Sequence, residues 1–521
     1  MTDAIELSLF RHLFASICDE MGAVLRKSAY SVNIKERRDY SCAVYDADGQ
    51  TVAMGDHMPV HLGAMPDSVR QVRRDLELGP GDVAIVNDPF RGGTHLPDIT
   101  AVSAVFLRGE TKPRFFLANR AHHSDVGGMS PGSMPLATEI YQEGIRIPPV
   151  HLVRGGHMDP QMLGLILANV RTPVEREGDI RAQISSLARG RERLVRTVAR
   201  YGAARVEANL AELMAYSERM MRARLQQIPA GIYKFADYLD SDGITPKRIR
   251  IAVTVTIGAR SATVDLSGSA PQVAGSVNAN HSIAVAATTY AFRCLLGEDV
   301  PFNEGLMRPI RIVNPEGLVT NARPPAAMAA GNVETSQRIT DVVLGALSRA
   351  VPDAIPAASS GTMNNLSFGG RDPIRNRPFA YYETIAGGMG ASVRGPGQSA
   401  VHTHMTNSLN TPVEAFEHQF PVRVRAYRVR RGSGGKGRHC GGDGVVKELE
   451  FLAGAEVTIL SDRRARGPYG LAGGDPGQPG INWLERAGRR RKVGAKARFQ
   501  VLCGDILGIE TPGGGGVGVL S

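Results

Sequence analysis

Residues 87–100 read NDPFRGGTHLPDIT. The stretch follows a short apolar run at residues 83–86, which predicts a buried strand that ends where the motif begins. A second polar stretch, NRAHHSDVGG at residues 119–128, follows the apolar runs ITAVSAVFL and RFFLAN in the same way. Because loops at the ends of strands often carry chemistry on a rigid scaffold, both stretches are candidate functional loops.

These two loops contain the residue types that bind divalent metal ions. His95 and Asp98 are three residues apart in the first loop, and His122, His123 and Asp125 lie in the second. Imidazole nitrogen and carboxylate oxygen suit zinc, manganese or ferrous iron. Adjacent residues of an extended segment point to opposite sides, so we expect only one of the two neighbouring histidines to be a ligand.

A further carboxylate ligand is available upstream, at Asp39 in KERRDYS. The glycine pairs at residues 92–93 and 127–128 allow a positive φ or a close approach of the backbone to an ion or substrate. His57 and His61 precede the first loop, and either line the site or occupy ordinary core or surface positions.

The alternative for the two loops requires no metal. In it, His95 and His122 satisfy loop carbonyls, and Asp98 caps the next element. A third polar stretch, GNVETSQRITD at residues 331–341, precedes an apolar helix and has two interpretations of its own. It either caps that helix or binds an anion at the helix N-terminus.

The rest of the chain predicts a mixed α+β protein of several domains. Apolar residues recur at helical spacing over residues 5–25, and YSCAVYDADGQTVAMGD predicts a β-hairpin that turns at Asp48-Gly49. We expect a metal-binding α+β region at 1–230 that ends in long helices interrupted at Gly202. A central α+β region at 231–415 and a glycine-rich β unit at 416–521 follow it.

Composition narrows the class of protein. The chain has 521 residues with 42% hydrophobic and 21% charged residues, as in soluble globular proteins. No apolar run is long enough to span a membrane and no signal peptide is recognisable, so a cytoplasmic protein is expected. The five cysteines are scattered, which disfavours a disulfide framework. A net charge of +10 makes nucleic-acid binding a candidate function, but no nucleic-acid-binding motif accompanies the charge. We therefore expect the excess basic residues to lie on solvated faces or in contacts between subunits.

Several motifs together resemble the hydantoinase B family, which includes B-type subunits of N-methylhydantoinase, 5-oxoprolinase and caprolactamase and of acetone and acetophenone carboxylases. The resemblance spans about residues 5 to 515. Besides the two loops it is carried by EGIRIPP, GNVETSQRITDVVLGAL, YYETIAGGMGA, TNSLNTPVEAFEHQFPVRV, SGGKGRHCGGDGVV and GPYGLAGGDPGQPG, which occur in the family's order.

The resemblance implies a metal-bearing subunit that works with an A-type, actin-like partner in a hetero-oligomer. The partner uses ATP to phosphorylate an amide or enol oxygen, and this chain has no recognisable nucleotide loop of its own. When the family's motifs are matched to this sequence, the resemblance implies Asp39, His95, Asp98 and His122 as the metal ligands. His123 and Asp125 are then candidate catalytic residues, with Asp125 orienting a histidine or acting as a base.

The expected activity is ATP-dependent hydrolysis of a small cyclic amide such as a hydantoin or 5-oxoproline. One alternative is a subunit of a ketone carboxylase of the same family. Another is a metal-free scaffold that only positions the A-type subunit. No nucleic-acid or membrane partner is expected.

Overall fold

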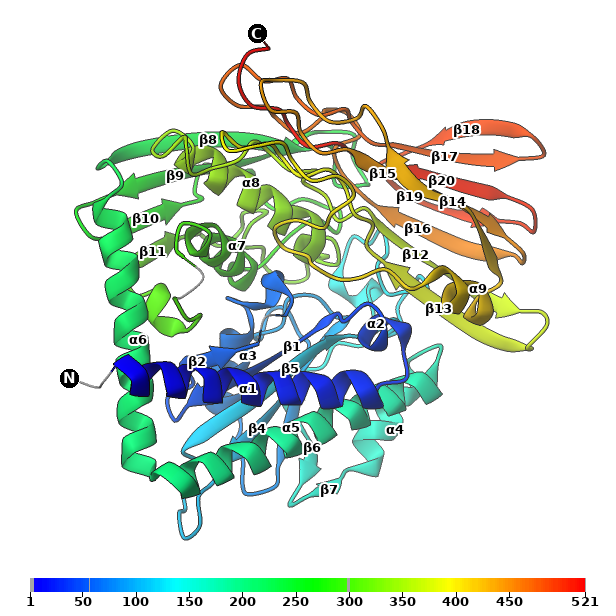
Figure 1. Cartoon of the computed structure of the whole chain (residues 1–521). Coiled ribbons are helices and arrows are strands. Elements are labelled where there is room, and N and C mark those ends of the chain that lie inside the picture. Colours follow the sequence, from blue (N-terminus) through cyan, green and yellow to red (C-terminus); the bar gives the residue numbers. More distant parts are fainter. Residues whose placement is uncertain (1–3, 56, 298–299, 521) are drawn as a thin grey trace.

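The computed structural model describes residues 4–55, 57–297 and 300–520. It consists of helices and of antiparallel or mixed sheets, which confirms the expected α+β class (Figure 1). The described strands form four sheets, one of seven strands, two of four and one of five. No helix in the described part of the chain is long and apolar enough to cross a bilayer.

The seven-stranded sheet contains the residues of both candidate loops. Its strand order is β2-β1-β5-β4-β3-β6-β7, and all neighbours are antiparallel. The strands are β1 (Tyr40–Asp46), β2 (Thr51–Met54), β3 (Val83–Val86), β4 (Asp98–Val105), β5 (Phe115–His122), β6 (Val150–Arg154) and β7 (His157–Met158). The predicted hairpin is therefore β1–β2, and the predicted strand at residues 83–86 is β3.

Helices cover both faces of this sheet, so strands β1 to β5 are buried on both sides. On one face α1 (Ala4–Ser28) and α5 (Pro173–Tyr201) pack against alternate residues of β1 and β5, such as Val44 and Leu117. On the other face α3 (Met65–Asp75) packs against the intervening residues. The apolar spacing predicted for residues 5–25 gives α1 its buried stripe, which includes Phe10, Phe14, Ile17, Met21 and Leu25.

The long helices end where glycine allows a change of direction. After α4 (Pro160–Ala168), α5 runs to Tyr201 and α6 (Ala203–Gln226) leaves at an angle (Figure 1). Gly202 between them has a φ of 83°, which a residue with a side chain rarely adopts. The predicted interruption at Gly202 is confirmed.

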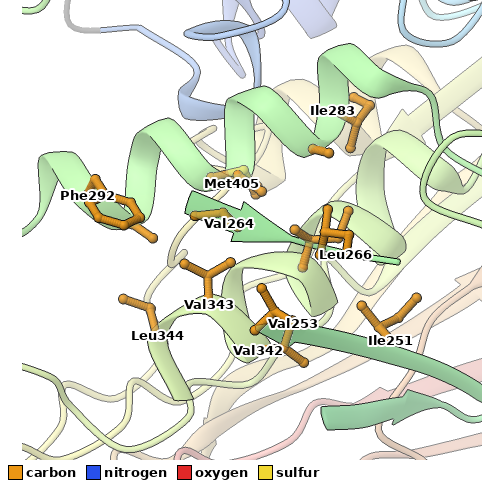
Figure 2. Packing of buried hydrophobic residues seen from close by; sticks show 14 of the residues in the cluster. Ile251, Val253, Val264, Leu266, Ile283, Phe292, Val342, Val343, Leu344 and Met405 are labelled. Carbon is orange, nitrogen blue, oxygen red and sulfur yellow. The ribbon is translucent and has the colours of Figure 1, made fainter. Parts of the chain in front are cut away.

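The central region is a four-stranded sheet backed by two helices. Its order is β11-β10-β9-β8, and its strands are β8 (Gly231–Leu239), β9 (Ile249–Ile257), β10 (Ala262–Asp265) and β11 (Ile310–Val313). Helices α7 (His281–Arg293) and α8 (Ser336–Leu347) pack with this sheet around one apolar core. Figure 2 shows Ile251 and Val253 of β9 facing Val342 and Val343 of α8, with Phe292 of α7 nearby.

The last part of the chain forms two further sheets. One has the order β13-β12-β16-β19 and the other β14-β15-β20-β17-β18. The strands are β12 (Asn365–Asp372), β13 (Arg377–Glu383), β14 (Val422–Arg430), β15 (Gly444–Phe451), β16 (Ala455–Leu460), β17 (Ile481–Arg486), β18 (Arg489–Val493), β19 (Lys496–Val501) and β20 (Ile506–Glu510). Because β12 pairs with β16, one sheet contains strands from both sides of the boundary expected at residue 416.

Short helical segments complete the description. They are α2 (Val32–Lys35), α9 (Val413–Gln419), the 3-10 turns Pro59–His61, Ile140–Gln142 and Glu304–Leu306, and a π-helix at Gly331–Thr335. The π-helix runs directly into α8. Such segments are uncommon and occur often at functional sites.

Candidate metal centre

Three neighbouring strands, β1, β5 and β4, bring candidate ligands together at one end of the seven-stranded sheet. Asp98 begins β4 and lies opposite His122, the last residue of β5. Asp39 immediately precedes β1, which pairs with the other side of β5, and its carbonyl accepts a hydrogen bond of 3.0 Å from the His122 amide. Strand pairing therefore places residues from three distant parts of the sequence side by side.

The first loop folds back tightly to bring His95 onto Asp98. The side chain of Asn87 donates to the carbonyls of Leu96 (2.8 Å) and Ile145 (3.0 Å). The Gly93 amide donates to the Asp88 carbonyl at 2.8 Å. A Cβ at Gly93 would lie 2.1 Å from the Asn87 carbonyl oxygen, so the loop closes only with glycine there.

Three side chains converge at the end of these strands. His95 Nε2 lies 3.0 Å from Asp98 Oδ1, and His122 Nδ1 lies 3.1 Å from the same oxygen. One ligand atom from each of the three residues lies within 4.8 Å of the others. All three side chains are buried.

Asp98 is held by several further neighbours. His61 Nε2 lies 3.4 Å from Asp98 Oδ2, and Thr94 Oγ1 donates to that oxygen at 3.0 Å. Burial alone would raise the pKa of Asp98, but the surrounding His95, His122 and His61 outweigh burial and hold this pKa well below its usual range. The carboxylate is therefore ionised and ready to accept a cation.

The histidines are oriented by groups outside the cluster. His95 Nδ1 lies 3.1 Å from the carbonyl of Ala329, so it donates there and turns Nε2 toward Asp98. The ring of His122 stacks on Tyr382 with centroids 4.4 Å apart and 16° between the planes. Burial lowers the pKa of His122, which favours the neutral imidazole that metals bind.

The residues present fit a divalent ion. Two imidazoles and one carboxylate form a nitrogen and oxygen donor set of the kind that zinc, manganese and ferrous iron accept. His122 Nε2 and Asn332 Oδ1 are buried and have no hydrogen-bond partner among the described residues. Buried polar atoms normally have hydrogen-bond partners. Two buried atoms without partners, next to this donor set, are consistent with a site that receives a metal ion and its remaining ligands.

Asp39, the fourth expected ligand, lies next to this cluster without being part of it. Its carboxylate Oδ2 is 3.9 Å from Arg37 Nη2, and it is not among the described residues whose ligand atoms meet within 4.8 Å. Its charge nonetheless acts on the imidazole of His122.

The two expected catalytic residues lie elsewhere. His123 points to the opposite side of the strand end from His122, and its Nε2 lies 3.0 Å from Gln183 Oε1 on α5. Asp125 accepts hydrogen bonds from the amides of Gly127, Gly132 and Arg171 and from the Arg171 guanidinium. Asp125 thus organises its own loop, and in the described part of the chain neither side chain bonds to a member of the cluster.

Sequence reasoning missed the contribution of the polar stretch at residues 331–341. The π-helix Gly331–Thr335 directs Asn332 at the cluster, where its Nδ2 lies 3.1 Å from His95 Nε2 and 3.3 Å from Asp98 Oδ2. Sequence reasoning also missed Tyr382, which stacks on His122, although this tyrosine lies in the motif YYETIAGGMGA. For His61 the sequence indicates no more than a possible neighbour of the site.

Comparison with known proteins assigns the family. The family model described as "Hydantoinase B/oxoprolinase" matches residues 3–519. The chain belongs to the hydantoinase B family. The resemblance stated from the motifs is confirmed.

Relatives of this hydantoinase B chain differ in length. It is 38% identical to an uncharacterized protein of Methanocaldococcus jannaschii, over 99% of this chain and 91% of that protein. It is 38% identical to 5-oxoprolinase 1 of Arabidopsis thaliana over 99% of its own length but only 42% of the relative's. It is 31% identical to a putative D-/L-hydantoinase component of a Pseudomonas species, covering 92% of this chain and 83% of the relative. The chain thus spans about two-fifths of the 5-oxoprolinase.

Solved structures with the same architecture include two ATP-dependent enzymes. The ATP-dependent caprolactamase from Pseudomonas jessenii matches with a TM-score of 0.92 at 28% identity, covering 100% of this chain and 92% of that one. Acetone carboxylase matches with a TM-score of 0.91 at 17% identity, covering 99% of this chain and 76% of that one. The second likeness shows a shared fold alone.

Proposed function

We propose that this hydantoinase B chain is the metal-bearing component of an ATP-dependent enzyme that hydrolyses a small cyclic amide. The observation that carries the proposal is the buried convergence of His95, Asp98 and His122 at one end of the seven-stranded sheet. Its relatives include 5-oxoprolinases and a putative hydantoinase component, and the caprolactamase shares its fold. These names support a ring amide of the hydantoin, lactam or 5-oxoproline type as the substrate.

ATP would be used by an A-type partner. The sequence has no phosphate-binding loop of the G-x-x-x-x-G-K-[ST] type. A ring amide resists hydrolysis because resonance weakens the carbonyl carbon as an electrophile. Phosphorylating the amide oxygen removes that resonance. Water then adds at the carbon, and the ring C–N bond breaks to leave a free amine and an acyl phosphate. A second water hydrolyses the acyl phosphate to a carboxylate and inorganic phosphate.

The residues of this chain would hold the ion and fix its surroundings. His95, Asp98 and His122 are the proposed ligands, with Asp39 as the neighbouring carboxylate. A divalent ion held there would supply a hydroxide near neutral pH or polarise the carbonyl oxygen. His61 and Thr94 hold Asp98 Oδ2, and the buried setting excludes bulk water from the cluster. The proposal assigns no step to His123 or Asp125, because both are bonded to groups outside the cluster.

The test is to purify the chain with an A-type subunit of the family and measure ATP hydrolysis with hydantoins, lactams, 5-oxoproline and ketones, with and without bicarbonate. We expect ring opening without bicarbonate, and its loss in Asp98→Ala but not in Asp372→Ala, whose buried carboxylate lies at the end of β12. Bicarbonate-dependent turnover of a ketone would instead identify a carboxylase. Full activity of Asp98→Ala would leave only a scaffold role.

A further inference from the structure

A buried glutamate lies behind the segment that supports His95. Glu143 is the first residue of the motif EGIRIPP, follows the 3-10 turn Ile140–Gln142, and has no exposed surface. Its Oε1 accepts hydrogen bonds from the backbone amides of Met328 (2.7 Å) and Ala329 (2.8 Å). A carboxyl group is costly to bury, and these two bonds satisfy its Oε1.

The residue whose amide Glu143 holds is the one whose carbonyl holds His95. The amide of Ala329 donates to Glu143, while the carbonyl of Ala329 accepts from His95 Nδ1 at 3.1 Å. Two consecutive hydrogen bonds therefore connect the Glu143 carboxyl to the imidazole ring. A carbonyl or carboxyl that receives the second ring N–H of a ligand histidine fixes both the tautomer and the orientation of the ring.

The same segment continues into the other group that faces the cluster. Three residues after Ala329, Asn332 of the π-helix approaches His95 and Asp98. On the preceding side the carbonyl of Ala327 accepts from the Asn278 side chain at 3.0 Å. Residues 326–332 are all buried and lie along one side of the cluster. In the middle of this segment, the amides of Met328 and Ala329 donate to the Glu143 carboxyl.

We propose that Glu143 is a positioning residue that sets the geometry of the metal centre through the backbone of Ala329 and the His95 ring. This inference rests on the proposed function, because it requires that His95 be a ligand. Among the described residues, Glu143 bonds to the backbone of Met328 and Ala329 and to no member of the cluster, so its effect is on how well the cluster holds an ion.

The protonation state of Glu143 indicates which substitutions distinguish the effect of its hydrogen-bond acceptor from the effect of its charge. Glu143 Oε2 has no hydrogen-bond partner among the described residues, and burial raises the pKa of Glu143 to about 8. The group is therefore mostly neutral at pH 7. Glutamine keeps the acceptor that faces Met328 and Ala329, whereas aspartate withdraws it by one methylene and alanine removes it.

The experiment measures cobalt(II) binding by chelator competition and by its d–d absorption in the full-length chain and in Glu143→Gln, Glu143→Asp and Glu143→Ala. We expect Glu143→Gln to stay within about 3-fold of the wild-type Kd with the same spectrum. Glu143→Asp and Glu143→Ala should bind about 10- to 100-fold more weakly with an altered spectrum, as is typical when a histidine loses its outer support. Asp372→Ala is the matched control, since Asp372 is also a buried carboxylate that accepts two backbone amides.

The outcomes separate the two proposals. If the wild type takes up no cobalt, the metal centre itself is wrong. If the wild type binds cobalt and both Glu143→Asp and Glu143→Ala match it in Kd and spectrum, only the role of Glu143 is refuted. Should those variants fail to fold, nitrogen-15 histidine spectra of the metal-free wild type decide, with His95→Gln identifying the signal. Protonation of His95 at Nδ1 supports the inference, and protonation at Nε2 overturns it.

Discussion

At the residue scale, the single side chain of Asp98 contacts most of the polar groups of the candidate site. Its two oxygens meet His95 and His122 on one side and His61 and Thr94 on the other. An ionised carboxylate in the interior is unfavourable unless it is paired. Thr94, His61 and His122 can donate hydrogen bonds to this carboxylate, and a divalent ion would supply the remaining charge.

A second buried carboxyl group near the site gives a prediction about pH. Glu334 of the π-helix is fully buried, and its Oε1 accepts from the Met363 amide (3.1 Å) and from Asn365 (2.8 Å). Burial, with a smaller contribution from Asp462 and an opposing one from Lys496, raises the pKa of Glu334 from 4.5 to about 8. The folded chain therefore binds more protons than the unfolded chain between these two pH values.

The stabilising effect of protonated Glu334 should be complete below about pH 4.5 and lost as the pH rises to about 8. Glu334→Gln removes this dependence. We expect the melting temperature of metal-free Glu334→Gln, relative to wild type, to increase steadily from pH 5 to pH 8 in thermal scans with EDTA. An offset that is the same at every pH in that range would contradict the raised pKa.

At the scale of elements, the loop between β3 and β4 depends on a close backbone contact. A Cβ at Gly93 would meet the Asn87 carbonyl at 2.1 Å, so Gly93→Ala must open the loop that carries His95. We expect a loss of stability of about 1–3 kcal/mol, typical of overpacking, together with weaker cobalt binding. Thermal scans and chelator competition measure the two effects. Gly164→Ala in α4 is the control, because a Cβ there meets no described atom within 4 Å; equal behaviour of the two variants would refute the loop's role.

Helix α8 is joined to distant segments by buried charges. Arg338 pairs with Asp341 (2.7 Å) on its own helix, with Asp237 (3.0 Å) of β8 and with Asp462 (3.1 Å) after β16. Arg338→Met would remove one of the two cations that each of these carboxylates meets, since Arg463 also pairs with Asp237 and Asp341, and Lys496 with Asp462. Removing one side of a buried ionic network costs about 3–5 kcal/mol, which denaturant unfolding would detect as a lower midpoint.

An exposed ion pair provides the comparison for Arg338. Arg181 is half exposed on α5 and pairs with Glu177 one turn away at 2.7 Å. Arg181→Met should change stability by no more than about 1 kcal/mol, because water already screens such a pair. Arg338→Met behaving like Arg181→Met would show that the network contributes little to stability.

At the scale of the whole molecule, sequence patterns predicted local structure well. The β1–β2 hairpin turns near Asp48-Gly49, β3 occupies the predicted residues, and Gly202 separates α5 from α6. Each of these depends on a few neighbouring residues. The pairing of β12 with β16 depends on contacts between strands about ninety residues apart, as Asn365 opposite Leu460 shows, and periodicity within a strand does not encode its partner.

The same distinction applies to the site. The convergence of His95, Asp98 and His122 could be predicted because they lie in short motifs at strand ends. The opposite orientations of His122 and His123 follow from the alternation of side chains in an extended chain. Asn332 lies 234 residues from Asp98 in the sequence and reaches it only through the packing of the central region. Its motif is visible in the sequence, but nothing local links it to the two loops.

Elemental analysis of the purified chain tests most directly whether these residues form a metal centre. After purification without chelators, the wild type and Asp98→Ala would be compared by mass spectrometry for zinc, manganese and iron. We predict about one divalent ion per wild-type chain and less than about a tenth of that in Asp98→Ala, since loss of a ligand from a buried site sharply weakens binding. Wild-type protein without a divalent ion, or a variant that retains the wild-type content, would contradict the account.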